Sequence, residues 1–127
     1  VSIKTDGDSV QIDTVRRLLY EIIYNLCDNA IRYNREGGSV QIHVGATPSG
    51  IEIAVSDTGI GIPPEDQSRI FERFYRVDKS HSKDTGGTGL GLSIVKHAVR
   101  YLGGEIRLES KVMQGTKITV LLPNTPA

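Results

Sequence analysis

The sequence Glu21-Ile-Ile-Tyr-Asn-Leu-Cys-Asp-Asn-Ala-Ile-Arg-Tyr33 predicts an amphipathic helix, because its apolar side chains recur every three or four residues. On a wheel that advances roughly 100° per residue, Asn25 and Asn29 lie together at the edge of the apolar arc. A single Asn in a helix is usually a solvated surface residue, since Asn has only ordinary helix propensity. Two amides four residues apart, beside an apolar face, instead predict one wall of a ligand pocket. The apolar arc consists of Val15, Leu18, Leu19, Ile22, Ile23, Leu26 and Ala30.

The predicted helix has short strands before it and a glycine pair after it. We expect strands at 1–4 and 10–12, and Asp13 or Thr14 is a suitable cap for the helix. The helix is expected to run on to about Tyr33, and the pair Gly37-Gly38 is expected to stop it. Two β-hairpins are predicted by alternating apolar residues on either side of turn residues, with strands at 40–44 and 51–55, and at 105–109 and 116–122.

Further helices are predicted between the two hairpins. A short helix is expected at 65–75, a polar loop at 77–87, and an amphipathic helix at 90–102 that ends before Gly103-Gly104. The sequence therefore predicts an α+β two-layer sandwich, in which about three helices cover one face of a mixed, mostly antiparallel sheet.

Length and composition limit the class of protein. The 127 residues suffice for one domain, which at this size buries roughly two thirds of its unfolded surface. Fifteen basic and fifteen acidic residues cancel, so we expect no binding to nucleic acid. The single cysteine, Cys27, excludes an internal disulfide and indicates a reducing compartment. The sequence contains neither an apolar run near the ~20 residues of a membrane span nor a signal-peptide pattern.

Two glycine motifs lie between the hairpins. Asp57-Thr-Gly-Ile-Gly-Ile-Pro63 follows a strand, where Gly59 and Gly61 allow close approach of a flat ligand and Asp57 can accept a hydrogen bond from an exocyclic amine such as that of adenine. The same residues also suit an ordinary turn. Gly86-Gly-Thr-Gly-Leu-Gly91 runs into a helix, whose free backbone N–H groups suit phosphate. Neither the dinucleotide-binding fingerprint nor a P-loop occurs in the sequence.

The order of these motifs resembles the catalytic, ATP-binding domain of sensor histidine kinases, in the superfamily that includes gyrase and a heat-shock chaperone. The resemblance covers nearly the whole chain, which we interpret as one domain, 1–127. The sequence at 74–78, Phe-Tyr-Arg-Val-Asp, is similar to that of the membrane-bound kinases of the phosphate-sensing type. The family's four boxes correspond to 25–33 (N box), 57–61 (G1), 71–76 (F box) and 87–91 (G2).

The resemblance implies roles for residues of the N box and G1. Asn29 matches a Mg²⁺ ligand, and Asn25 assists from the same helix face, directly or through water. Arg32 matches a position that contacts phosphate, and Tyr33 one whose ring packs on adenine. Asp57 matches the carboxylate that reads adenine, with Gly59 and Gly61 making room for the base.

The resemblance also implies that the F box, the G2 box and the lid segment bind the phosphates. Arg76 matches an arginine near the γ-phosphate, and 63–87 corresponds to an ATP lid, anchored by Phe71 and Phe74. Lys83 in this lid either reaches the phosphates or is a solvated loop charge. The phosphate-binding box consists of Gly87, Thr88, Gly89, Leu90 and Gly91.

One departure from the superfamily bears on mechanism. ATP-hydrolysing relatives carry a Glu one turn before the metal-binding Asn, whereas this chain has Asn25, and an amide cannot act as a general base. Slow hydrolysis and transfer to a protein acceptor are therefore predicted, with Glu21 interpreted as a helix-surface charge. The resemblance thus implies an ATP-dependent protein histidine kinase with ATP and Mg²⁺ as ligands, acting in two-component signal transduction.

The phosphoacceptor is not found in the sequence. None of His43, His81 and His97 precedes an acidic residue, as acceptor histidines of the family do. The resemblance implies an N-terminal dimerisation domain carrying the acceptor, a response regulator as partner, and a membrane-anchored homodimer with this domain in the cytoplasm. The fragment alone is expected to be monomeric and unable to phosphorylate itself.

Three other functions fit the sequence less well. An anti-sigma-factor-type serine kinase has the same fold, but such kinases generally lack an F box. A degenerate domain that acts only by binding a partner is disfavoured because all four boxes are intact. A receiver domain phosphorylated on Asp57 is disfavoured because alternating parallel strands and helices are absent from the pattern.

Overall fold

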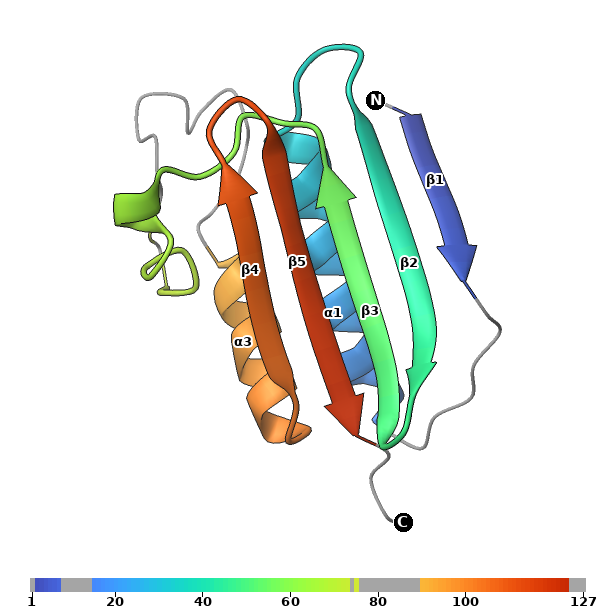
Figure 1. Cartoon of the computed structure of the whole chain (residues 1–127). Helices are drawn as coiled ribbons and strands as arrows, with labels where there is room; N and C mark the ends of the chain where they lie inside the picture. Colours follow the sequence, from blue (N-terminus) through green and yellow to red (C-terminus); the bar gives the residue numbers. More distant parts are fainter. Residues whose placement is uncertain (1, 8–14, 74, 76–89, 124–127) are drawn as a thin grey trace.

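Residues 2–7, 15–73, 75 and 90–123 are described by a computed structural model, in which helices pack on one face of a five-stranded sheet (Figure 1). This confirms the predicted α+β two-layer sandwich. The elements follow in the order β1 Ser2–Gly7, α1 Arg16–Arg32, β2 Ser39–Thr47, β3 Gly50–Asp57, the 3-10 helix η1 Pro64–Asp66, α3 Gly91–Tyr101, β4 Glu105–Lys111 and β5 Gly115–Pro123.

The sheet is mixed and mostly antiparallel, as predicted. Its strand order is β1-β2-β3-β5-β4, and only β1 and β2 run parallel among the pairs of this sheet. Both predicted hairpins are present, and the register sets Asp57 at the end of β3 between Val40 and Thr116. On the edge strand β1, the Asp6 carboxylate contacts the side chains of Gln41 and His43, so His43 lies on a face of β2.

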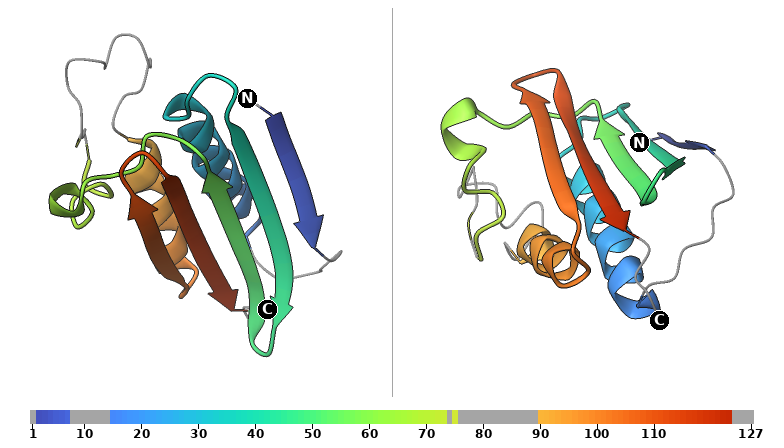
Figure 2. Two further views of the ribbon diagram at one scale, coloured as in Figure 1. Left: turned by 45° about the horizontal axis from the view of Figure 1, so that its top comes forward. Right: turned by 60° about the horizontal axis from the view of Figure 1, so that its bottom comes forward.

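The core lies between the sheet and the two α-helices, which run side by side beneath the sheet in both views of Figure 2. Alternation along β3 and β5 turns one set of apolar side chains toward the helices. The apolar arc predicted for the first helix supplies the facing side chains. The most deeply buried core residues are Ile22, Leu26, Ala30, Val40, Ile53, Val55, Val95, Ala98, Val99, Ile118, Val120 and Leu122.

The helix ends differ in part from the sequence prediction. The N-cap of α1 is Val15, which makes no side-chain capping bond, so the predicted cap at Asp13 or Thr14 is wrong. At its other end α1 stops at Arg32, within one residue of the predicted end near Tyr33. Asn34 bonds the following turn: its amide donates to Ser39 O at 2.8 Å and accepts from Arg35 N at 2.9 Å.

The end of α3 follows the prediction closely. The helix covers Gly91–Tyr101, within one residue of the expected 90–102. Gly103 has φ +76°, and the Gly104 N–H donates to Val99 O at 2.9 Å, which closes the last turn with a left-handed glycine.

The expected helix at 65–75 is wrong. Among the described residues of this range, only Pro64–Asp66 forms a helix, of the 3-10 type, and turns follow it. In these turns several N–H groups bond the carbonyl three residues earlier, as in Arg69 N to Asp66 O at 2.9 Å, whereas an α-helix needs a spacing of four. Among the described residues two α-helices, rather than about three, therefore cover the sheet, and η1 lies beyond the β4 edge (Figure 1).

The predicted strand at 10–12 and loop at 77–87 lie outside the described residues. Within the described ranges, neither α-helix is long and apolar enough to cross a membrane.

Candidate functional site

Described residues of three predicted boxes lie next to α1: the N box is in α1 itself, G1 follows the end of β3, and Gly91 begins α3 (Figure 1). A β-carbon built on Gly91 would lie 3.3 Å from Asn25 Oδ1, which places the start of α3 against the N box. The Ile60 N–H donates to Tyr33 O at 3.1 Å, which joins G1 to the end of α1. Residues far apart in the sequence therefore contact α1, and a common site formed by the boxes stays a prediction.

The two amides of the N box have different surroundings. Asn25 donates from Nδ2 to Glu21 O at 2.7 Å, so its amide nitrogen is fixed by its own helix. Asn29 is half-buried, yet its side chain has no hydrogen-bond partner in the described part of the chain. A partly buried amide without a partner loses solvation and regains nothing from the protein. Asn29 is therefore the amide that a ligand or metal ion would satisfy.

The backbone holds one of the two carboxylate oxygens of Asp57. Its Oδ1 accepts hydrogen bonds from Gly59 N at 2.9 Å and Thr116 N at 3.3 Å. Oδ2 accepts no bond from the described residues, which leaves it for a ligand donor such as an exocyclic amine. Burial raises the pKa of Asp57 from its ordinary 3.8, and the two backbone bonds offset part of that effect.

Close packing explains why positions 59 and 61 are glycine, and the sequence alone does not reveal it. A β-carbon on Gly59 would lie 2.2 Å from Tyr33 O, and one on Gly61 2.1 Å from Lys111 O in β4. Gly61 also has φ +73°, a left-handed conformation that favours glycine. Both glycines therefore let the chain pass close to its own backbone, and their contact with an adenine base stays a prediction.

The remaining described candidates lie at helix ends. Arg32, in the last turn of α1, donates from Nε to Asp28 Oδ2 at 2.7 Å, and this carboxylate raises the pKa of Arg32. Tyr33 follows as the C-cap of α1 and is half-buried. Leu90 is the N-cap of α3, where its carbonyl accepts bonds from Ile94 N and Ser93 Oγ. Their predicted phosphate and adenine contacts stay predictions.

Some candidates cannot be placed. The predicted roles of the other F-box, lid and G2 residues stay predictions, because these positions lie outside the described residues: Phe74, Arg76, Lys83, Gly87, Thr88 and Gly89. Phe71 is described and half-buried, but the side chain that is buried in this segment is Ile70.

A network around Thr58 supports the site and was missed by the sequence interpretation. Thr58 Oγ1 accepts from Ser39 N at 2.9 Å and donates to Asn34 Oδ1 at 3.3 Å, which ties the end of β3 to the turn after α1. Ser110 of β4 makes a second tie, because its hydroxyl accepts from Ile62 N at 2.8 Å. Single Ser, Thr and Asn residues in turns carry no signal of such long-range pairing.

The donor set fits a magnesium ion that takes most of its ligands from phosphates. Within the described ranges, no group of three or more His, Cys, Asp or Glu side chains is arranged to hold a metal ion by itself. Amide oxygens such as those of Asn25 and Asn29 suit Mg²⁺, which commonly binds through few protein groups plus substrate phosphates. The partnerless Asn29 amide is consistent with that kind of site.

Comparisons with known proteins agree with the fold and the motifs. Residues 14–126 match the family described as histidine kinase-, DNA gyrase B-, and HSP90-like ATPase. The chain is 46% identical over 124 residues to the sensor-like histidine kinase SenX3 of Mycobacterium tuberculosis (strain ATCC 25618 / H37Rv), covering 97% of this chain and 30% of SenX3.

Two solved structures are similar along nearly the whole chain. The mycobacterial sensor histidine kinase MprB superposes with a TM-score of 0.84 at 31% identity, covering 99% of this chain and 85% of that chain. Full-length ShkA in complex with AMPPNP superposes with a TM-score of 0.81 at 30% identity, covering 99% of this chain and 26% of that chain. The chain belongs to the family of histidine kinase-, DNA gyrase B- and HSP90-like ATPases, as an ATP-binding catalytic domain of the sensor histidine kinase type.

Proposed function

We propose that this domain binds Mg²⁺-ATP and supplies the γ-phosphoryl group to a histidine that lies on a dimerisation domain outside this chain. The observation that carries the proposal is the pair of open acceptors among the described residues, the side chain of Asn29 in α1 and Oδ2 of Asp57, with G1 bonded to the end of α1 through Ile60 N and Tyr33 O. The AMPPNP bound to the similar ShkA supports a triphosphate nucleotide as the ligand.

Each residue has a defined part in this function. Asp57 accepts a hydrogen bond from the adenine amine, and the Tyr33 ring packs on the base. Asn29, assisted by Asn25, holds the metal ion, which supplies positive charge at the β- and γ-phosphate oxygens when bound. Arg32 and Arg76 add charge near the phosphates. Because no general base stands at Asn25, water is a poor acceptor and a protein histidine is favoured.

The partners and location are proposed from the relatives. The chain spans about a third of the length of SenX3, and we assign the acceptor histidine and the dimer contacts to regions beyond it. The response regulator is a separate partner protein. We place the domain on the cytoplasmic side of a membrane-anchored sensor in a two-component system. A degenerate partner-binding domain remains the alternative, and ATP binding distinguishes the two.

Calorimetric titration with and without Mg²⁺ tests the proposal. We expect Mg²⁺ to enhance ATP binding by the wild-type domain. Asn29→Ala is expected to weaken binding in Mg²⁺ at least tenfold, or about 1.4 kcal/mol. The reason is that the substitution removes an amide oxygen that no described residue uses.

Ile31→Ala is the matched control, because this side chain lies two residues further along α1 and is 41% exposed. It should bind ATP like the wild type. A folded wild type that does not bind ATP would favour the degenerate domain. Equal binding by Asn29→Ala and wild type would move the metal site away from Asn29.

ATP affinity should also decrease as the pH is lowered. The decrease should begin at a higher pH than it would if Asp57 had an unshifted pKa. Burial raises the pKa of Asp57, so its carboxylate takes up a proton at a pH above the ordinary 3.8 and loses strength as an acceptor. Affinity is thus full well above the raised pKa and decreases as the pH falls toward it. Calorimetry across a pH series measures this change.

Asp57→Asn is the control for that series, since an amide does not titrate. The nucleotide's own phosphate titration affects both proteins equally and cancels in their difference. A pH dependence that is identical in Asp57→Asn and wild type would exclude Asp57 as the titrating group.

A further inference from the structure

The side of the sheet that faces the helices changes from apolar to polar at one end. Val55 and Ile118, which lie opposite each other in β3 and β5, belong to the core. Two residues further along the same face, Asp57 lies opposite Thr116, and Thr116 lies opposite Ser110 of β4. Residues that are directly opposite in paired strands share a face of the sheet. We call Asp57, Thr116 and Ser110 the polar row.

The members of the polar row bond one another in series. Thr116 is the only polar residue that is buried in the described ranges, with 8% of its surface exposed. Its N–H donates to Asp57 Oδ1 at 3.3 Å, and its hydroxyl oxygen lies 2.8 Å from Ser110 Oγ. A buried hydroxyl needs such a partner, because desolvation without a hydrogen bond is costly.

Three groups contact the Ser110 hydroxyl. The Ile62 N–H donates to it at 2.8 Å, Gly115 O accepts from it at 3.1 Å, and Thr116 Oγ1 is the third contact. The position of Ile62 is itself fixed, because Gln67 donates from Nε2 to Ile62 O at 2.9 Å and to Ser110 O at 3.2 Å. The surroundings of the Ser110 hydroxyl are therefore set by the main chain.

The direction of the bond between Ser110 and Thr116 follows from counting protons. A hydroxyl donates one hydrogen bond and accepts two. Ser110 accepts from the Ile62 N–H and gives its only proton to Gly115 O, so the contact with Thr116 is a bond only if Thr116 donates. The reverse direction would leave Ser110 Oγ and Gly115 O as two acceptors 3.1 Å apart. Thr116 therefore uses its proton on Ser110.

Two oxygens of the polar row remain open, and both are acceptors. Asp57 binds the backbone through Oδ1, which leaves Oδ2. Thr116 Oγ1 has spent its proton and keeps lone pairs. Apart from the bond between Thr116 and Ser110, neither oxygen has a partner in the described part of the chain. The open side of the row thus offers lone pairs without a proton.

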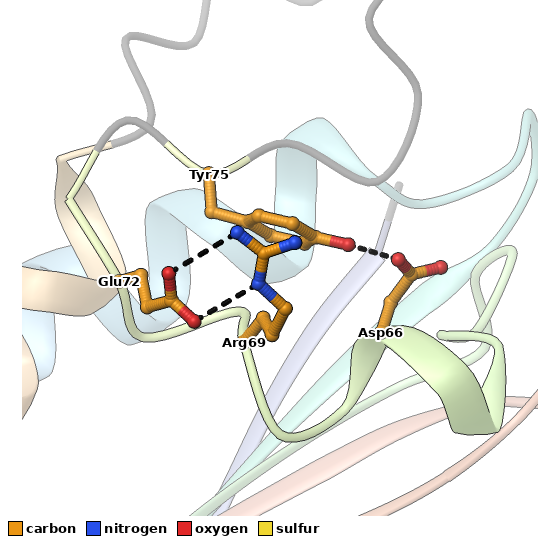
Figure 3. Close-up of polar contacts among 4 residues, drawn as sticks. All are labelled: Asp66, Arg69, Glu72 and Tyr75. Carbon is orange, nitrogen blue, oxygen red and sulfur yellow. Dashed lines mark hydrogen bonds and ion pairs between the residues drawn. The ribbon is translucent and has the colours of Figure 1, made fainter.

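The polar side chains in the turns after η1 differ in this respect. Tyr75 donates to Asp66, and Arg69 donates from Nε to Glu72 at 3.0 Å, so these four side chains bond one another (Figure 3). They satisfy each other rather than a ligand, whereas the polar row is satisfied on one side only.

Neighbouring acceptors favour a ligand edge that carries a donor. Adenine has an exocyclic amine where guanine has a carbonyl, and a carbonyl can only accept. Facing Asp57 Oδ2 and Thr116 Oγ1, a carbonyl would lose its solvation and meet only lone pairs. A site built to bond an N–H group strongly rejects the analogue that lacks it.

We propose that Ser110 is a positioning residue that sets the preference for adenine over guanine nucleotides, because it takes up the Thr116 proton and keeps that oxygen an acceptor. This inference rests on the proposed function, in which Asp57 binds the adenine amine. Without the Ser110 hydroxyl, Thr116 is free to turn its proton toward the ligand, and a carbonyl gains a donor.

The test is calorimetric titration of Mg²⁺-ATP and Mg²⁺-GTP into the wild-type domain and Ser110→Ala, with the Tm measured for each protein. The quantity compared is the ratio of the two Kd values. Wild type is expected to prefer ATP by at least about a hundredfold. Ser110→Ala should lower that preference about tenfold, or about 1.4 kcal/mol. A purely structural effect, such as loosening of Ile62, would weaken both nucleotides equally and leave the ratio unchanged.

Two control variants accompany Ser110→Ala. Ser110→Thr keeps the hydroxyl and should retain the wild-type ratio within about twofold, a difference below about 0.5 kcal/mol. Ser56→Ala removes a hydroxyl from β3 one residue before Asp57, on the opposite face of the sheet, and should not change the ratio.

Thr116→Val removes the second acceptor itself and should also lower the preference for ATP. Ser110→Ala added to Thr116→Val should change the ratio no further, since there is no longer a Thr116 proton to control. Thr116→Val also tests the same acceptor should Ser110→Ala fail to fold.

The possible failures are distinguishable. A folded wild type that binds neither nucleotide would overturn the proposed function and this inference with it. A wild type that binds ATP and GTP equally well would overturn only the inference. The same holds for a ratio that Ser110→Ala leaves unchanged, or for one that Ser110→Ala still lowers in the Thr116→Val background.

Discussion

Replacing Gly59 with alanine is expected to destabilise the domain by about 3 kcal/mol or more, at the upper end of the range for overpacked sites. The added β-carbon would lie 2.2 Å from Tyr33 O and 2.9 Å from Asn34 Cα. Both are backbone atoms, so no side chain can rotate away. Relief requires the end of α1 to separate from G1, which breaks the bond from Ile60 N to Tyr33 O.

Chemical denaturation followed by circular dichroism measures the stability loss in Gly59→Ala, and calorimetry on the folded fraction measures ATP binding. ATP binding should weaken as well, because Tyr33 and Asp57 lie on the two sides of the separated contact. The matched control is Gly37→Ala, where φ is +74° but nothing lies within 4 Å of the added carbon. That control should lower the free energy of unfolding only by the strain of a left-handed alanine, about 1–2 kcal/mol. Equal losses in the two variants would contradict the steric argument.

Leu26→Ala is expected to cost about 2–5 kcal/mol of unfolding free energy, because the substitution leaves a cavity in a close-packed core. Leu26 is only 1% exposed and lies between the two amides of the N box in α1. The cavity would therefore open directly beneath Asn25 and Asn29, and metal-dependent ATP binding should weaken together with stability.

Denaturant titrations of Leu26→Ala and Ile31→Ala form the comparison. Ile31 is on the same helix but 41% exposed, and surface substitutions usually change stability by about 0.5 kcal/mol or less. A cost below about 1 kcal/mol for Leu26→Ala, under the 2–5 kcal/mol range above, would mean that the helix does not pack on the sheet as described.

Periodicity in the sequence was enough to predict both hairpins and both α-helices. Strict alternation in 40–44 and 51–55 specifies strands with one buried face, and the apolar arc through Ile22 and Leu26 specifies the helix face. These signals are local, and burial against a partner layer reinforces them.

The prediction failed where tertiary contacts choose between similar local patterns. At 65–75 a helix-like composition forms turns of three residues, because Tyr75 bonds Asp66 and Arg69 lies over the Tyr75 ring. A four-residue repeat would not bring these side chains together in the same way.

The glycines of G1 show a second limit of sequence reasoning. The sequence shows that space is needed at Gly59 and Gly61, but the structure shows that backbone from α1 and β4 fills that space. Lys111 lies 50 residues beyond Gly61, so only the folded topology reveals their contact. Similarly, the hydrogen bonds of Asn34, Thr58 and Ser110 depend on long-range pairing that no local pattern encodes.

The position of β5 has a consequence for how the chain is made. β5 is the last strand in the sequence, yet it lies inside the sheet, paired with β3 on one side and β4 on the other. Until β5 leaves the ribosome, β4 has no neighbour in the sheet and the apolar face of β3 lacks half of its surroundings. Since synthesis proceeds at about 5–20 residues per second, the nascent domain waits several seconds with its ATP-binding motifs already translated but without the core that aligns them.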